Sequence, residues 1–291
     1  MNLDKLLAFK KVYEANSFQK ASHDIGSFSS VVTRQIQKLE QEVGYKLLNR
    51  SKVGLTLTDA GEIIYELACD IATLQEEAIE KVNASKKEFE GDIKILTTQG
   101  SINTWLVDKA SDFLLNNPKV KLDIVGLNDL IDLKNIQTEV VVGPLSENYD
   151  FLEKIFLRSY RLFLYASEPY LRKYGIPKDY EDLHDHKVIS FAGGRGSSFG
   201  DVDWFLSEQK KMVKPALNIN SSVGLLKAAE KNLGIVSLGD ELVKEHGAKL
   251  VRVFPTEPGK IIDIFYMYHK KMNTLRRVRA FGEYLHQQLN G

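Results

Sequence analysis

The sequence has a single cysteine and no long apolar run, and each shortage excludes a class of protein. Cys69 has no second cysteine to pair with inside the chain, so the disulfide-rich secreted domains are excluded. No stretch approaches the roughly 18 consecutive apolar residues that a membrane-spanning helix needs. Lys5, Lys10 and Lys11 interrupt the apolar start of the chain, which argues against a signal peptide. We therefore expect a cytoplasmic protein with no membrane partner.

The chain also lacks an excess of charge of either sign, with 39 Lys and Arg against 39 Asp and Glu. This balance excludes binding to nucleic acid by bulk charge alone. The charges are nevertheless unevenly distributed: residues 1–58 carry a net +4, residues 59–90 a net −6 and residues 91–291 a net +2. A small basic segment beside an acidic one favours a nucleic-acid-binding face near the N-terminus.

The first 44 residues have the pattern of a helix-turn-helix. Apolar residues at three- and four-residue steps predict a helix from Leu3 to Tyr13, and Ser17 can cap a second helix that begins at Phe18. Gly26 allows a tight turn, after which the hydroxyls of Ser27, Ser29 and Ser30 are available to the start of a third helix. The apolar stripe of that helix is Val32, Ile36, Leu39 and Val43. Two short helices joined by a glycine-containing turn are typical of a helix-turn-helix.

The outward side of the third helix carries groups that can bond phosphates and base edges. These candidate DNA-binding residues are Ser29, Ser30, Thr33, Arg34 and Gln37. A solvated helix face is the alternative interpretation of the same stripe. After Gly44, a short basic turn and the alternating residues 55–58 predict a two-stranded wing that carries Arg50 and Lys52.

Residues 17–62 resemble the winged helix-turn-helix of LysR-type transcriptional regulators. The matching positions are Ser17-Phe18, Ala21, Ile25, residues 32–36, Leu39-Glu40, Leu47-Leu48, Arg50, Leu57-Thr58 and Ala60-Gly61. The resemblance implies a double-stranded DNA partner, Thr33 and Arg34 in the major groove, and Arg50 and Lys52 on the DNA backbone or minor groove. Phe28 stands where the family usually has a serine, and Ser29 where it often has a base-reading glutamine. Because of these two departures, the resemblance implies the docking geometry but not the exact base preference. Ser22 is a third departure, since it replaces the second of a usual alanine pair.

Residues 59–90 are predicted to form a long linker helix, capped by Thr58 and free of proline. Its apolar seam is Ile64, Leu67, Ile71, Leu74, Ala78 and Val82. A long helix with one apolar seam needs a packing partner. In the family that this chain resembles, the linker helix pairs two copies, which implies a homodimer or homotetramer.

Residues 91–291 alternate strands with helices, which predicts an α/β domain with a largely parallel sheet. The expected strands are 91–98, 120–125, 139–143, 160–166, 187–191, 234–238 and 261–268, and helices are expected near 105–113, 221–231 and 273–289. The segment resembles the effector-binding domain of the same family. That resemblance implies two lobes like those of periplasmic binding proteins, lobe I at about 91–161 and 267–291 and lobe II at about 162–266, with a ligand cleft between them.

Ligands of such sheets bind beyond the carboxyl ends of strands, where helix N-termini can meet an anion. The candidate effector-binding residues in these places are Thr98, Gln99, Ser101, Gly143, Ser221 and Ser222. They predict a small effector, with an anion among the candidates. The alternative is that the hydroxyls only cap helices. The segment 126–138 is shorter than usual in this family. The cleft is therefore expected to be reshaped or reduced, with either an unusual ligand or none.

We expect no metal, no cofactor and no enzymatic activity. His184-Asp185-His186 lacks a partner cluster of metal ligands. The glycine-rich residues 193–198 lack the Lys-Ser/Thr of a phosphate-binding loop. The functional hypothesis is a transcriptional regulator with three parts, a DNA-binding domain (1–58), a linker helix (59–90) and an effector-binding domain (91–291). The alternative is a two-lobed small-molecule-binding protein whose N-terminal helices make protein contacts only.

Overall fold

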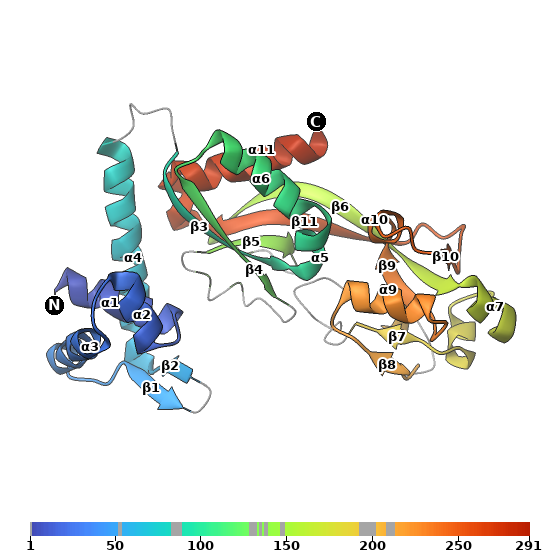
Figure 1. Ribbon diagram of the computed structural model, residues 1–291, viewed down its shortest axis with the longest axis horizontal. Helices are drawn as coiled ribbons and strands as arrows, with labels where there is room; N and C mark the ends of the chain where they lie inside the picture. Colours follow the sequence, from blue (N-terminus) through green and yellow to red (C-terminus); the bar gives the residue numbers. More distant parts are fainter. Residues whose placement is uncertain are drawn as a thin grey trace. The chain divides into compact units, whose positions relative to one another are not determined.

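The computed structural model divides the chain into two compact units, residues 1–86 and 87–291 (Figure 1). The residues that the structure describes are 2–51, 54–82, 89–127, 133, 136, 139–145, 149–191, 202–207 and 213–291. Among them, no helix is both long and apolar enough to cross a membrane.

The first unit is the winged helix-turn-helix that the sequence predicts. Its elements are α1 Leu3–Glu14, α2 Phe18–Ile25, α3 Ser29–Val43, β1 Leu48–Ser51, β2 Gly54–Leu57 and α4 Asp59–Val82. Ser17 Oγ accepts a hydrogen bond from the Lys20 N–H, Gly26 has a φ of 68°, and Thr58 Oγ1 accepts from the Gly61 N–H at 3.0 Å. These three local predictions are confirmed. They could be made from sequence because each cap or turn involves residues only a few positions apart.

The core of the first unit holds α3 against α1. Val32, Ile36 and Leu39 are buried with Leu6, Phe9 and Val12, which lie on one face of α1. Tight burial of one stripe leaves the opposite stripe of α3 exposed, because a helix presents residues three and four apart on the same face.

Side-chain bonds attach the wing to the helices. Asn16, which has a left-handed φ of 48°, accepts a hydrogen bond from the Leu55 N–H at 2.6 Å. Glu40 Oε1 accepts from the Leu47 N–H at 2.8 Å, which joins α3 to the start of β1. The wing is therefore held in a defined position beside α3.

The described part of the second unit is built on a seven-stranded mixed sheet with the order β10-β6-β11-β5-β3-β4, and β9 pairs with β6. The strands are β3 Gly91–Thr98, β4 Val120–Leu127, β5 Glu139–Pro144, β6 Leu152–Ser167, β9 Val236–Gly239, β10 Leu250–Arg252 and β11 Lys260–His269. β3 pairs in parallel with β4 and β5, but β6 and β11 run antiparallel. The expectation of a largely parallel sheet is wrong for these two long strands, which lie side by side in the second unit (Figure 1).

Helices cover this sheet at both ends. The remaining elements are α5 Gln99–Ser101, the π-helical η1 Ile102–Leu106, α6 Val107–Asn116, α7 Glu168–Tyr174, η3 Glu181–Asp185, β7 Ile189–Ser190, α8 Trp204–Ser207, β8 Leu217–Asn218, α9 Ser222–Glu230, α10 Asp240–Glu245, η4 Lys270–Thr274 and α11 Arg276–Asn290. One buried cluster packs α6 and α11 on the sheet, around Phe113 and Phe281. Separate clusters surround Tyr170 and Leu225 at the other end of the unit. Two groups of cores are the packing expected of two lobes, and the α/β fold class is confirmed.

Candidate functional site

The outward stripe of α3 offers polar side chains from its N-terminal half. Ser30, Arg34 and Gln37 are exposed and follow one another at four- and three-residue spacing, so they lie on one face of the helix. Thr33 is half-buried and its hydroxyl donates to the Ser29 carbonyl at 2.8 Å. Ser29 is also half-buried. The exposed face is therefore narrower than the five residues expected from sequence.

A groove lies between α3 and the wing. Thr33, Gln37 and Glu40 line its α3 side, and Lys46, Asn49 and Arg50 line the opposite side. The Arg50 guanidinium stacks on the Phe18 ring with its Cζ at 4.4 Å from the ring centroid. Stacking of this kind orients a guanidinium while leaving its edge available. Lys52, the other candidate of the wing, lies outside the described residues.

The start of α3 differs from the serine-rich cap suggested by residues 27–30. The N-cap residue is Phe28, and no side chain bonds the first turn. The Phe28 side chain is 80% exposed. Phe28 departs from the usual serine of the resembled family, and it is not among the DNA-binding residues expected from sequence.

The apolar residues of α4 divide between two faces, so they do not form the single seam expected. Ile64 and Ile71 pack against the core of the first unit, and Cys69 is buried. The exposed apolar residues Ile63, Leu67, Leu74, Ala78 and Val82 follow a separate line. The difference arises because α1 packs against α4 and occupies part of the apolar surface.

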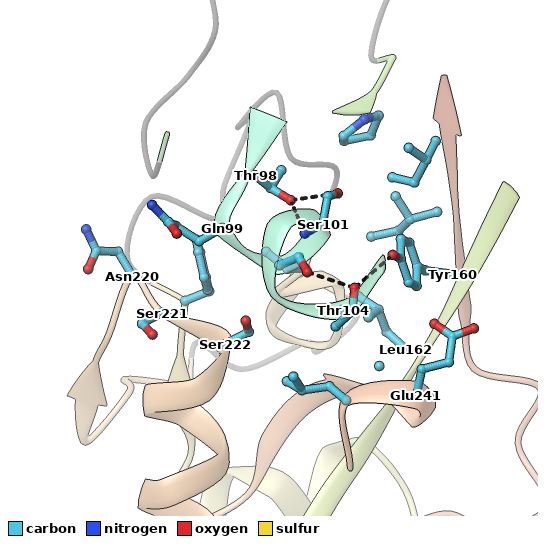
Figure 2. Close-up of a pocket in the computed structure, with 18 of the residues that line it drawn as sticks. Thr98, Gln99, Ser101, Thr104, Tyr160, Leu162, Asn220, Ser221, Ser222 and Glu241 are labelled. Atoms are coloured by element: carbon cyan, nitrogen blue, oxygen red, sulfur yellow. Dashed lines mark hydrogen bonds between the residues drawn. The ribbon is translucent and has the colours of Figure 1, made fainter. Parts of the chain in front are cut away.

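A cavity of about 150 Å³ opens in the second unit between the first turn of α5 and the start of α9 (Figure 2). Five of the six candidate effector-binding residues line it: Thr98, Gln99, Ser101, Ser221 and Ser222. Gly143 is not among the described lining residues, although its neighbour Pro144 is. The structure thus brings together residues that are more than a hundred positions apart in the sequence.

Two of these hydroxyls also cap helices, as the alternative interpretation proposed. Thr98 Oγ1 accepts from the Ser101 N–H at 3.0 Å and donates to Ser101 Oγ at 3.1 Å. Ser221 Oγ accepts from the Gly224 N–H at 3.2 Å. Ser222 Oγ lies only 3.9 Å from the position that a Cβ on Gly100 would take, so the two sides of the cavity approach closely there.

The rest of the lining is mostly apolar, and sequence reasoning missed it. The additional residues are Gly100, Thr104, Leu127, Pro144, Tyr160, Leu162, Phe191, Val202, Asn220, Gly239, Glu241, Leu242, Ile262 and Ile264. Burial raises the pKa of Tyr160 to about 12, so its hydroxyl stays neutral, and it lies 3.3 Å from Thr104 Oγ1 (Figure 2). Glu241 is ion-paired with Arg158. Among the described lining residues there is no Lys or Arg.

In the described part of the chain, no group of three or more His, Cys, Asp or Glu residues is placed to hold a metal ion. His184 Nε2 lies 3.2 Å from Asp185 Oδ1 at the surface. The glycine-rich residues 193–198 lie outside the described residues.

Comparison with known protein families covers both units. A family model described as "LysR substrate binding domain" matches residues 86–290. A second, described as "Bacterial regulatory helix-turn-helix protein, lysR family", matches residues 3–62. A relative named HTH-type transcriptional regulator, from Xanthomonas campestris pv. campestris (strain 8004), is 27% identical over 297 residues, which cover 99% of this chain and 86% of the relative.

Solved structures share the fold over nearly the whole chain. ArgP from Mycobacterium tuberculosis has a TM-score of 0.72 at 19% identity, covering 99% of this chain and 97% of that one. Full-length CbnR complexed with its target DNA has a TM-score of 0.59 at 18% identity, covering 98% and 100%.

Proposed function

The chain belongs to the LysR family of bacterial transcriptional regulators, and from that premise we propose how its parts divide the work. It is a DNA-binding transcriptional regulator with an effector-binding domain, and it is not an enzyme. Residues 1–58 bind double-stranded DNA, residues 59–90 pair two copies, and residues 91–291 bind the effector between lobe I (about 91–161 and 267–291) and lobe II (about 162–266). The alternative of N-terminal helices that make only protein contacts is set aside.

The exposed line of Ser30, Arg34 and Gln37 on α3 supports the assignment of DNA contacts. In a helix-turn-helix, the N-terminal part of the second helix enters the major groove, where an Arg can bond two acceptors of guanine. Arg50, stacked on Phe18 across the groove, contacts the DNA backbone or the minor groove beside it. Ser29 and Thr33 act mainly by holding the first turns of the helix, because both are half-buried.

The experiment is selection of bound DNA from a random pool by the full chain, followed by titration of the selected site. Arg34→Ala is expected to weaken binding to that site by about 1–3 kcal/mol and to relax base preference at one position. Arg50→Ala is expected to weaken binding to all sequences alike and to reduce the salt dependence.

Arg172→Ala is the matched control, since it removes an exposed arginine of the second unit that pairs with Glu168 along α7. If Arg34→Ala binds the selected site as the wild type does at the same salt concentration, the assignment of α3 is wrong.

The homo-oligomer is supported by the exposed apolar line on α4. Leu74 is 62% exposed and Val82 is 82% exposed, at positions where a second copy of the helix can cover them. The structure of CbnR was solved in complex with its target DNA. A protein of this fold that pairs two DNA-binding domains can bind two half-sites. A transcriptional regulator must be in the compartment that holds its DNA, so we propose that this protein is cytoplasmic.

The effector is a compact and mostly apolar molecule with one hydrogen-bonding group. The apolar lining accommodates its body, and a volume of about 150 Å³ is that of a cavity known to hold benzene. Its polar group faces Thr98 and Ser222. Because the described lining has no cation, an anionic effector would depend on the backbone N–H groups at the two helix starts.

A further inference from the structure

Phe28 is an exposed aromatic residue at a position where neither core packing nor helix capping requires one. Its side chain is 80% exposed, and the described hydrophobic core of the first unit does not include it. A phenyl ring left in water forgoes the stabilisation that burial of an aromatic side chain provides. Packing therefore does not account for this residue.

Helix capping does not account for Phe28 either. At the N-cap of α3 its backbone has the usual extended conformation, with φ −87° and ψ 143°, and its carbonyl accepts from the Val31 and Val32 N–H groups. Ser, Thr, Asp and Asn are preferred at this position because their side chains bond the orphan N–H groups of the first turn, which phenylalanine cannot do. The protein thus retains a residue that is unfavourable for the helix.

The position of Phe28 indicates what the ring contacts. It precedes the face of α3 that carries Ser30 and Arg34, at the end of the helix that enters the major groove. Val31, one turn further, is 45% exposed and extends the apolar surface. In the major groove, the apolar group that a base pair presents is the C5-methyl of thymine, and phenylalanine is among the side chains that contact it.

We propose that Phe28 is a specificity-determining residue that recognises a thymine in each half-site through its C5-methyl group. This inference rests on the proposed DNA-binding function of residues 1–58. The ring covers the methyl group and removes it from water, whereas the exposed polar side chains of α3 bond neighbouring base edges. The recognised thymine lies next to the bases that Arg34 contacts.

The test uses the full chain and a site selected from random DNA. Each thymine of the site is replaced in turn by deoxyuridine, which keeps base pairing and removes only the methyl group. The wild type is expected to bind about fourfold more weakly when one particular thymine in a half-site is replaced, as befits one lost buried methyl. Phe28→Ser is expected to be indifferent to that replacement, and Phe28→Leu to retain part of the sensitivity.

Stability provides an independent readout, because serine restores a side-chain cap. Phe28→Ser is expected to raise the Tm while it lowers discrimination, so the two effects have opposite signs. Tyr45→Ser is the control, since it removes another exposed aromatic residue, 69% exposed, just beyond the other end of α3. Its uridine profile should match that of the wild type.

Two results would overturn the inference: no thymine shows sensitivity to methyl loss, or the sensitivity persists in Phe28→Ser. Both require that a site has been selected, so they are distinct from failure of the proposed function, in which no sequence is enriched at all.

Discussion

Asp240 shows how much one side chain can hold together in the effector-binding domain. Arg252 Nη2 donates to Asp240 Oδ1 at 2.7 Å, Lys244 Nζ lies 2.8 Å from Oδ2, and the Tyr165 hydroxyl donates to Oδ1. Burial acts to raise the pKa of Asp240, but these three donors outweigh it and the pKa is lowered. The carboxylate therefore joins β6, β10 and the start of α10.

This cluster predicts a loss of stability in acid. Because the folded pKa lies below the unfolded value, the contribution of Asp240 is complete above the unfolded pKa and is lost as the pH falls through the folded pKa. Asp240→Asn is expected to lower the free energy of unfolding by about 1–3 kcal/mol at pH 7 and to flatten its decline below about pH 4. Denaturant unfolding at a series of pH values measures both effects.

Glu168→Gln is the control for that series, since it removes a carboxylate from an exposed pair with Arg172 that contributes little. Equal pH profiles for Asp240→Asn and the wild type would contradict the prediction.

Among the elements, α4 both packs into the core of the first unit and presents an exposed apolar face, and its apolar pattern alone does not distinguish the two. One face completes the core of the first unit through Ala68 and Ile71, and another leaves Leu67 and Leu74 exposed. A single helix can serve both because residues three and four apart define each face. We expect the second face to be covered by another copy of α4.

Leu74→Asp tests this face. A carboxylate in an apolar interface loses its hydration without a partner, so the variant is expected to dissociate the oligomer while each chain stays folded. Sedimentation velocity measures the mass, and circular dichroism checks the fold. Gln75→Asp, which places the same charge at the next exposed position off the apolar line, should assemble as the wild type does. An unchanged mass for Leu74→Asp would show that the copies meet elsewhere.

For the whole molecule, the effector can act only through different affinities for two arrangements of the oligomer. We expect effector binding to change the spacing or angle between the two paired DNA-binding domains and hence the bend of the bound DNA. The apolar cavity is the place where this difference in affinity arises, because both lobes contribute to its lining.

Leu127→Trp tests the cavity, since Leu127 is a half-buried lining residue and a larger side chain there fills part of the space. The variant is expected to keep its affinity for DNA and to lose at least tenfold in affinity for a ligand that stabilises the wild type. Benzoate, benzamide and benzylamine, which share a ring and differ in charge, serve as probes in thermal unfolding. Stabilisation by benzoate alone would support an anionic effector, which is one of the candidates that the sequence allows.

Val107→Trp, at an exposed position of α6 outside the described lining, should respond to the probes as the wild type does. If Leu127→Trp and the wild type respond equally to a stabilising probe, the effector does not bind in this cavity.

Local sequence was sufficient to predict the winged helix-turn-helix and the positions of most helices. Ser17, Gly26 and Thr58 were predictable as caps and turns because their capping bonds join residues only three or four positions apart. The strand predicted at 160–166 is the end of β6, whose first half consists mostly of exposed and half-buried residues. A half-exposed strand has a weaker apolar signal than a continuous buried one, so its true length was missed.

The sequence by itself thus determined the family, the winged helix-turn-helix with its caps, and the hydroxyls near the cleft. Tertiary structure decided that β6 and β11 pair antiparallel, and that Tyr160, Leu162 and Ile264 from these strands line the cavity. It also decided that α1 covers one face of α4 and leaves Leu74 exposed. The physical reason is range: capping and periodicity depend on neighbours in sequence, whereas register, burial and cavity lining depend on partners that only folding brings together.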